Sequence, residues 1–131
     1  MDKVRVLLVD DEPDIIFVIG KKIKVEDYEL LDAQSGKAAI DVVKNKKADI
    51  VVLDYMMPEM DGVETLKRIR KIDKNIPVIM FTAHPDMSSI EGTEKLNVSS
   101  YVPKISMYSS AEDTLKSALS LAVKRLPKSP K

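Results

Sequence analysis

An aspartate stands at the end of an apolar run near the middle of the chain. Asp54 follows Ile50–Leu53, whose β-branched side chains and leucine are typical of a strand buried on both faces of a parallel sheet. A pair of acidic residues, Asp10 and Asp11, follows a second run of this kind, Val4–Val9. Open parallel sheets bind ligands at the carboxyl ends of their strands, so three carboxylates are expected to meet at one edge.

Three carboxylates at one edge of a sheet predict a divalent metal. Like charges at close range are costly unless a cation or protons neutralise them. Hard oxygen ligands in this number suit Mg²⁺. A metal beside a carboxylate indicates phosphate chemistry, so we predict a Mg²⁺ site at which a phosphoryl group is handled.

The composition is that of one domain without a dominant charge. A length of 131 residues is enough for a single domain with a full core. The 21 Lys and Arg balance the 21 Asp and Glu, which removes any global argument for a nucleic acid partner. The absence of cysteine excludes disulfides and thiolate metal sites, and it fits the cytoplasmic location that we expect. No apolar stretch approaches the roughly 20 residues that span a bilayer, so no membrane partner is expected.

Strand-like apolar runs alternate with helical patterns along the chain. Pro13 fits the first turn of a helix, and Ser35 and Asp61 are candidate N-caps of two more. The weak helix formers from about Asp86 to Leu96 predict a fourth helix of low stability, closed by Asn97 in a left-handed conformation. The predicted strands are Val4–Val9, Glu29–Ala33, Ile50–Leu53, Ile76–Phe81 and Ser100–Val102.

This order of elements predicts the fold class. Five β–α repeats with right-handed crossovers give an α/β fold, a five-stranded doubly wound parallel sheet of (βα)5 flavodoxin-like type with strand order 2-1-3-4-5. The first and third strands are then neighbours, which brings Asp10, Asp11 and Asp54 together. Residues 1–126 are predicted to form the domain, and residues 127–131, with two prolines, a flexible tail or the stub of a linker.

The third predicted helix has an apolar stripe and a basic face. Val63, Leu66 and Ile69 recur at helical spacing and are predicted to be buried. The basic positions around them are interpreted as a solvated face; they are Lys67, Arg68, Arg70 and Lys71.

Together these residues resemble the response-regulator receiver domain of two-component signalling, and the chain is similar to the single-domain chemotaxis type. The resemblance covers essentially the whole chain. It rests first on the acidic pair Asp10 and Asp11 and on Asp54, which match the family's metal and phosphoacceptor positions. The further matches are Met57-Pro58, Gly62, Thr82 with Ala83, Tyr101 and Lys104.

The resemblance implies a phosphorylation-controlled signalling switch. A phosphoryl group would pass from a phosphohistidine of a sensor histidine kinase or a phosphotransfer protein, or from a small phosphodonor, to the carboxylate of Asp54. Asp11 and Asp54 would hold Mg²⁺ directly, together with the backbone carbonyl of Met56. Asp10 would act on the metal largely through water.

Further residues would contact the phosphoryl oxygens and carry the signal. By the same resemblance, Lys104 pairs with one oxygen and Thr82 donates its hydroxyl to another. Thr82 and Tyr101 would form the switch that reaches a protein partner through the face made by the fourth helix, the fifth strand and the last helix. Met56 and His84 would flank the approach of water and tune the loss of phosphate. No direct contact with nucleic acid is expected.

One departure from the family concerns the loop that carries Lys104. The family usually has a proline directly after this lysine, commonly with a cis bond, whereas here Ile105 follows and Pro103 precedes it. A cis bond without proline costs roughly 2.5–4 kcal/mol. We therefore predict a trans Lys104–Ile105 bond and expect any cis bond at Val102–Pro103.

Other interpretations of the acidic edge are open. A Mg²⁺-dependent phosphatase or phosphotransferase with an aspartate nucleophile also uses a strand-end aspartate, but it generally needs a second acid close after it and a cap domain. A constitutive interaction module would never use the phosphate site. In a purely structural role, Asp10 or Asp11 would cap the first helix. We expect a switch that catalyses its own phosphorylation and dephosphorylation, not an enzyme with an external substrate.

Overall fold

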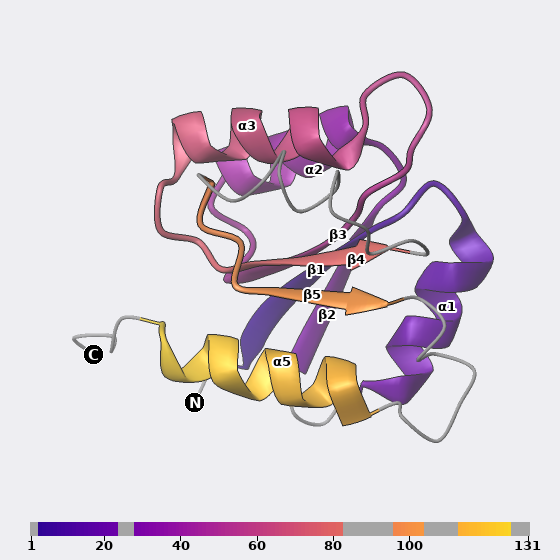
Figure 1. Cartoon of the computed structure of the whole chain (residues 1–131), viewed down its shortest axis with the longest axis vertical. Coiled ribbons are helices and arrows are strands. Elements are labelled where there is room, and N and C mark those ends of the chain that lie inside the picture. The colour runs from indigo at the N-terminus through magenta and orange to yellow at the C-terminus, as the bar shows by residue number, and fades with distance from the viewer. Residues whose placement is uncertain (1–2, 24–27, 83–95, 104–112, 127–131) are drawn as a thin grey trace.

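A parallel sheet forms the middle layer of the computed structural model, which describes residues 3–23, 28–82, 96–103 and 113–126. Its five strands lie in the order β2-β1-β3-β4-β5, and every neighbouring pair is parallel. Helices cover both faces (Figure 1). The predicted fold class and strand order are confirmed. The elements are β1 (Val4–Val9), α1 (Pro13–Lys22), β2 (Tyr28–Ala33), α2 (Gly36–Lys44), β3 (Ile50–Asp54), α3 (Gly62–Ile72), β4 (Val78–Thr82), β5 (Ser100–Pro103) and α5 (Asp113–Lys124).

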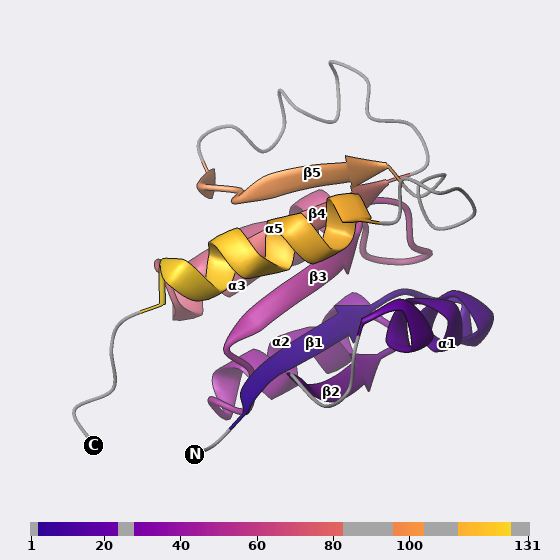
Figure 2. The ribbon, with the colours of Figure 1, turned by 90° about the horizontal axis from the view of Figure 1, so that it is seen from below.

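The core has two halves, one on each face of the sheet. Alternate strand residues point to opposite faces. One set, with Val52 and Phe81, packs with α1 and α5, while the other, with Leu53 and Met80, packs with α2 and α3. Figure 2 shows β2 and β5 at the two edges of the sheet, with β3 in the middle. All five residues of β3 are buried, as expected for a strand covered on both faces.

The N-caps predicted for α2 and α3 are confirmed. Ser35 Oγ accepts a hydrogen bond from the backbone N–H of Ala38 at 3.1 Å, and Asp61 Oδ1 accepts one from Glu64 N–H at 2.9 Å. The carboxylate of Glu64 accepts a hydrogen bond from Arg68 Nε at 2.9 Å, one helical turn further along α3. This hydrogen bond holds the pKa of Glu64 below its ordinary value.

The prediction for the buried stripe of α3 is partly wrong. Leu66 and Ile69 are fully buried, but Val63 is only half-buried, and Thr65 is buried in its place. Thr65 tolerates burial because its hydroxyl donates to the carbonyl of Asp61 at 2.8 Å.

The solvated-face interpretation is wrong for Arg70. Its guanidinium donates to four backbone carbonyls: Nε to Leu96 at 2.7 Å, Nη1 to Asp73 at 3.2 Å and to Ile76 at 2.7 Å, and Nη2 to Asn97 at 3.0 Å. Burial lowers the pKa of Arg70, and the charge of Asp73 opposes this shift. Arg70 therefore ties the end of α3 to the segments that enter β4 and β5.

Several sequence predictions fall on residues beyond the described ranges. The helix predicted from Asp86 lies almost wholly outside them, as do the Lys104–Ile105 bond and the tail. Asn97 does have the predicted left-handed backbone, with φ of 57°. The peptide bonds of the described residues are trans, including Val102–Pro103. Within the same ranges, no helix has the length and apolar character needed to cross a membrane.

Candidate functional site

Two buried carboxylates lie at the carboxyl edge of the sheet. Asp54 ends β3, and Asp10 directly follows β1; each is 1 % exposed. The register pairs Val9 with Leu53, so Asp10 and Asp54 occupy corresponding positions on neighbouring strands. The expectation that the sheet brings these two residues to one edge is met by its topology.

Each of these carboxylates organises the turn that follows it. Asp54 Oδ1 accepts from the backbone N–H of Met56 at 3.2 Å, and Asp10 Oδ1 accepts from that of Glu12 at 2.9 Å. In both cases the donor is two residues on, as in an Asx turn. The N-cap of α1 is Glu12, and that cap has no side-chain hydrogen bond. Capping of the first helix by Asp10 or Asp11 is therefore not found.

An oxygen-rich cluster lies at the end of β1. One carboxylate oxygen from each of Asp10, Asp11 and Glu12 lies within 4.8 Å of the others. Asp10 is buried, Asp11 half-buried and Glu12 exposed, so the cluster runs from the interior to the surface. Hard oxygen donors at this spacing fit Mg²⁺. Glu12 was not among the residues predicted to hold a metal, although it directly continues the acidic pair.

Gly62 fixes the backbone of the phosphoacceptor candidate. Its N–H donates to the carbonyl of Tyr55 at 2.8 Å. A Cβ added to Gly62 would clash with the carbonyl oxygen of Asp54 and would come within 2.8 Å of Tyr55 Cα. The φ of Gly62 is not positive, so its backbone angles do not require glycine. Glycine is needed because only a residue without a Cβ lets the two backbones approach this closely. The first turn of α3 thus packs directly against the residue that carries the carboxylate.

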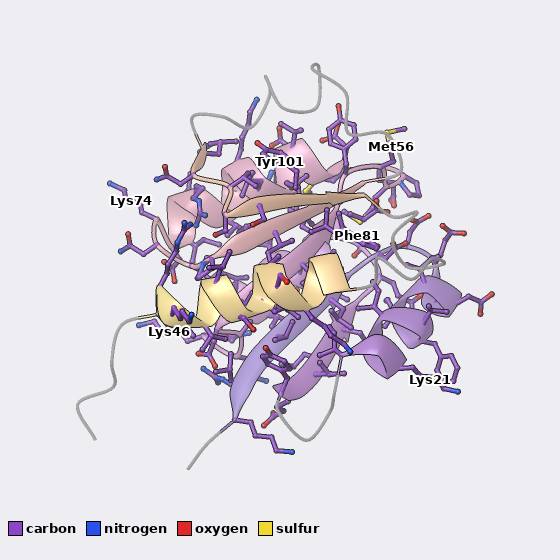
Figure 3. All side chains as sticks on the ribbon, turned by 60° about the horizontal axis from the view of Figure 1, so that its bottom comes forward. Lys21, Lys46, Met56, Lys74, Phe81 and Tyr101 are labelled. Atoms are coloured by element: carbon purple, nitrogen blue, oxygen red, sulfur yellow. The ribbon has the colours of Figure 1, made fainter. Side chains whose placement is uncertain are left out.

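The remaining predicted site residues are described to different degrees. Met56 is 64 % exposed, while Tyr101, in β5, is half-buried and packs against the α2 and α3 half of the core. Both are labelled in Figure 3. Thr82 ends β4, but its side chain lies outside the described part of the structure. Lys104 and His84 lie outside it entirely.

Removing one carboxylate from this edge is expected to stabilise the metal-free protein. Asp10 and Asp54 repel each other when both are ionised and buried side by side. We expect Asp54→Asn, and also Asp11→Ala, to raise the free energy of unfolding at neutral pH by roughly 1–4 kcal/mol, the range for two unit charges about 4 Å apart at effective dielectric constants between about 80 and about 20. Urea titrations with and without Mg²⁺ measure the effect.

Magnesium should stabilise wild type more than the variants that lack one of these carboxylates. A ligand at 100 times its Kd stabilises the folded state by about 2.7 kcal/mol, and we expect wild type to gain more from Mg²⁺ than either variant. Asp41→Asn, an exposed change in α2, is the matched control and should behave as wild type. Equal gains from Mg²⁺ in wild type, Asp54→Asn and Asp11→Ala would mean that these acids share no metal.

Comparisons with known proteins agree with this arrangement. The sequence matches the response regulator receiver domain over residues 6–119. It is 33 % identical over 117 residues to sporulation initiation phosphotransferase F of Bacillus subtilis (strain 168), covering 89 % of this chain and 94 % of that protein. It is 32 % identical over 115 residues to the transcriptional regulatory protein GlrR of Escherichia coli (strain K12), covering 85 % of this chain but only 26 % of that longer protein.

A solved structure gives the same result. The response regulator protein TrrA from Thermotoga maritima, determined in complex with Mg²⁺–BeF, superimposes with a TM-score of 0.79 at 31 % identity. The match covers 91 % of this chain and 98 % of that one. With its parallel sheet in the order 2-1-3-4-5 and its acidic edge, the chain belongs to the response regulator receiver domain family of two-component systems.

Proposed function

We propose that Asp54 is the phosphoacceptor of this receiver domain and that its phosphorylation requires Mg²⁺. The observation that carries the proposal is the burial of Asp54 and Asp10 side by side at the carboxyl edge of the sheet. In the transfer, an Asp54 carboxylate oxygen forms a bond to phosphorus as the bond to the donor's histidine nitrogen breaks. The donor would be a sensor histidine kinase or a phosphotransfer protein.

The chain's own oxygens fit a role in holding the metal. Asp10, Asp11 and Asp54, with the backbone carbonyl of Met56, would hold Mg²⁺, which neutralises charge on the phosphoryl oxygens when bound. The Mg²⁺–BeF complex of TrrA supports this choice of metal. Glu12 lies close enough to Asp10 and Asp11 to share in the site through its exposed carboxylate.

The other roles follow from the family. Lys104 would pair with a phosphoryl oxygen, and the Thr82 hydroxyl would donate to a second one. Thr82 and Tyr101 would then transmit the phosphorylation state to a protein partner at the face made by β5, α5 and the helix predicted from Asp86. We propose that this cytoplasmic switch has no external substrate and contacts neither nucleic acid nor membrane directly.

The proposal is tested by intact mass spectrometry. Wild-type protein incubated with Mg²⁺ and acetyl phosphate should gain one phosphoryl group, and Asp54→Asn should gain none because its amide is not a nucleophile. Asp41→Asn keeps the acidic edge intact and should match wild type. A full-level adduct on Asp54→Asn would overturn the assignment, while multiple turnover of a generic phosphate ester would favour an aspartate-nucleophile phosphatase.

The side chain of Met56 is expected to lengthen the life of the acyl phosphate. Loss of phosphate requires a water in line with the bond to the Asp54 oxygen. Met56 is exposed beside that carboxylate and is apolar, so it can exclude water but cannot orient it. His84 would flank the same approach and hold the phosphoryl oxygens when protonated. We expect the double variant Met56→Asn/His84→Glu to release phosphate faster, by less than about 100-fold.

The measurement is phosphate release from purified phosphoprotein in excess Mg²⁺. Met60→Asn changes another methionine of the same loop and is the control for general loosening of the segment. A double variant that releases phosphate at the wild-type rate, or more slowly, contradicts shielding but leaves Asp54 as the acceptor.

A further inference from the structure

A cavity of about 270 Å³ lies at the edge of the sheet opposite the acidic site. Two of its lining residues, Pro77 and Ser99, directly precede β4 and β5. Since β4 has five residues, at about 3.3 Å per residue the cavity lies roughly 15 Å from the acidic edge. Figure 3 shows Lys74, which lines the cavity, and Met56, which follows Asp54, on opposite sides of the molecule.

The described residues that line this cavity are rich in donors and include no acid. Three are cationic: Arg70 and Lys74 from the end of α3, and Arg125 from the end of α5. The side chains of Asn75, Asn97 and Ser99 add two amides and a hydroxyl. The lining therefore combines three positive charges with neutral donors, which is the chemistry that recognises anions.

The negative groups near the cavity are already engaged. The C-terminus of a helix carries partial negative charge, which would disfavour an anion. Arg70, however, donates to the carbonyl of Asp73, the C-cap of α3, and to three carbonyls in the segments that lead into β4 and β5, those of Ile76, Leu96 and Asn97. The carboxylate of Asp73 does not line the cavity, and its Oδ1 accepts from the N–H groups of Asn75 and Ile76 at 2.9 and 3.0 Å.

Two of the three cations can adapt to a ligand. Lys74 and Arg125 are exposed, and the structure gives their side chains no ion pair among the described residues. Arg70 has five N–H groups, of which the four hydrogen bonds leave one, on Nη2. A fixed cation beside two movable ones can contact an anion that carries more than one charged group.

We propose that this cavity binds a small polyanion with two adjacent charged groups, such as a diphosphate or a di- or tricarboxylate. Its volume lies just below the usual range of small-molecule sites, about 300–1,000 Å³, which favours a compact ligand. The proposal goes beyond phosphorylation and is independent of it, because none of the lining residues belongs to the acidic edge.

The test is a titration of wild-type protein, freed of divalent metal, with pyrophosphate and separately with citrate at constant ionic strength. Backbone amide signals followed by NMR should shift and saturate at Asn75, Asn97 and Ser99. Saturation by either probe supports the site, and the tighter probe identifies the preferred charged group. The variant Lys74→Gln/Arg125→Gln should weaken binding by about tenfold or more, a change of about 1.4 kcal/mol. Arg70 is left in place because it also holds the fold together.

The matched control removes two cations elsewhere. Lys44→Gln/Lys46→Gln changes the net charge equally but alters exposed residues at the end of α2, outside the cavity lining. Its affinity for both probes should equal that of wild type. Equal weakening in the two double variants would overturn the proposal, since the anions would then sense only the general charge. Shifts that grow linearly and spread over all the basic residues would overturn it as well.

Discussion

Gly62→Ala is expected to destabilise the protein by about 1–3 kcal/mol, the cost of overpacking a site that cannot relax. The added methyl group would meet the carbonyl oxygen of Asp54 and the Cα of Tyr55, both of which are backbone atoms. Relief requires α3 and the end of β3 to move apart, which displaces Asp54, the proposed phosphoacceptor. We therefore also expect phosphorylation by acetyl phosphate to slow, by up to about 100-fold for a misplacement near 1 Å.

Gly20→Ala is the matched control for this substitution. Gly20 also lies in a helix, but a Cβ there would meet only Leu30 Cδ1 at 3.6 Å, which is an ordinary contact. This variant should be more stable than wild type by roughly 0.5–1 kcal/mol, the helix preference of alanine over glycine. Urea unfolding measures the free energy of unfolding of both variants. A Gly62→Ala protein as stable as Gly20→Ala would show that the close approach carries no cost.

Arg70→Ala is expected to lower the free energy of unfolding by about 3 kcal/mol. Hydrogen bonds from a charged donor contribute roughly 1.5–3 kcal/mol each, and a half-buried carbonyl that loses its donor is partly compensated by water. Four carbonyls lose this partner, among them those of Leu96 and Asn97, which lie more than 25 residues further along the chain. The loss should destabilise the segment that leads into β5 more than it destabilises α3.

Two variants separate the geometry of Arg70 from its charge. Arg70→Lys keeps the charge but not the planar fork, so it should recover only part of the loss. Arg68→Ala removes a neighbouring arginine whose ion pair with Glu64, at 2.9 Å, is exposed to solvent and therefore contributes little to stability. If Arg70→Ala costs no more than Arg68→Ala in urea unfolding, the four contacts do not stabilise the fold.

The sheet was predictable because its signals are local. Each strand of a parallel sheet is a continuous apolar run, and right-handed crossovers restrict the order of strands. Strand ends were less predictable. Asp54 belongs to β3 because its backbone pairs with Phe81 in β4, and Ile76 and Pro77 precede β4, where proline has no N–H for the ladder. Such boundaries depend on the neighbouring strand and are not read from one segment alone.

The role of Arg70 could not be predicted from helical periodicity. Its position on α3 is that of a surface residue, and its acceptors are backbone carbonyls, which leave no trace in the side-chain pattern. Thr65 was missed for a related reason, because its burial depends on a hydrogen bond to Asp61 one turn earlier. By contrast, Asp10 and Asp54 were recognised as neighbours because Asp10 directly follows β1 and Asp54 ends the adjacent strand β3.

The complete burial of β3 bears on the motions of the protein. Its backbone N–H groups are hydrogen-bonded within the sheet, between β1 and β4, and its side chains are covered on both faces. Amide hydrogens in such a strand exchange with solvent only when the whole domain opens, whereas those of exposed turns exchange through local fluctuations. Asp54 thus ends a strand whose amide hydrogens are expected to exchange slowly, while Met56 and Glu59 lie in the exposed turn that follows. We therefore expect the carboxylate of Asp54 to keep its position while the exposed turn after it fluctuates.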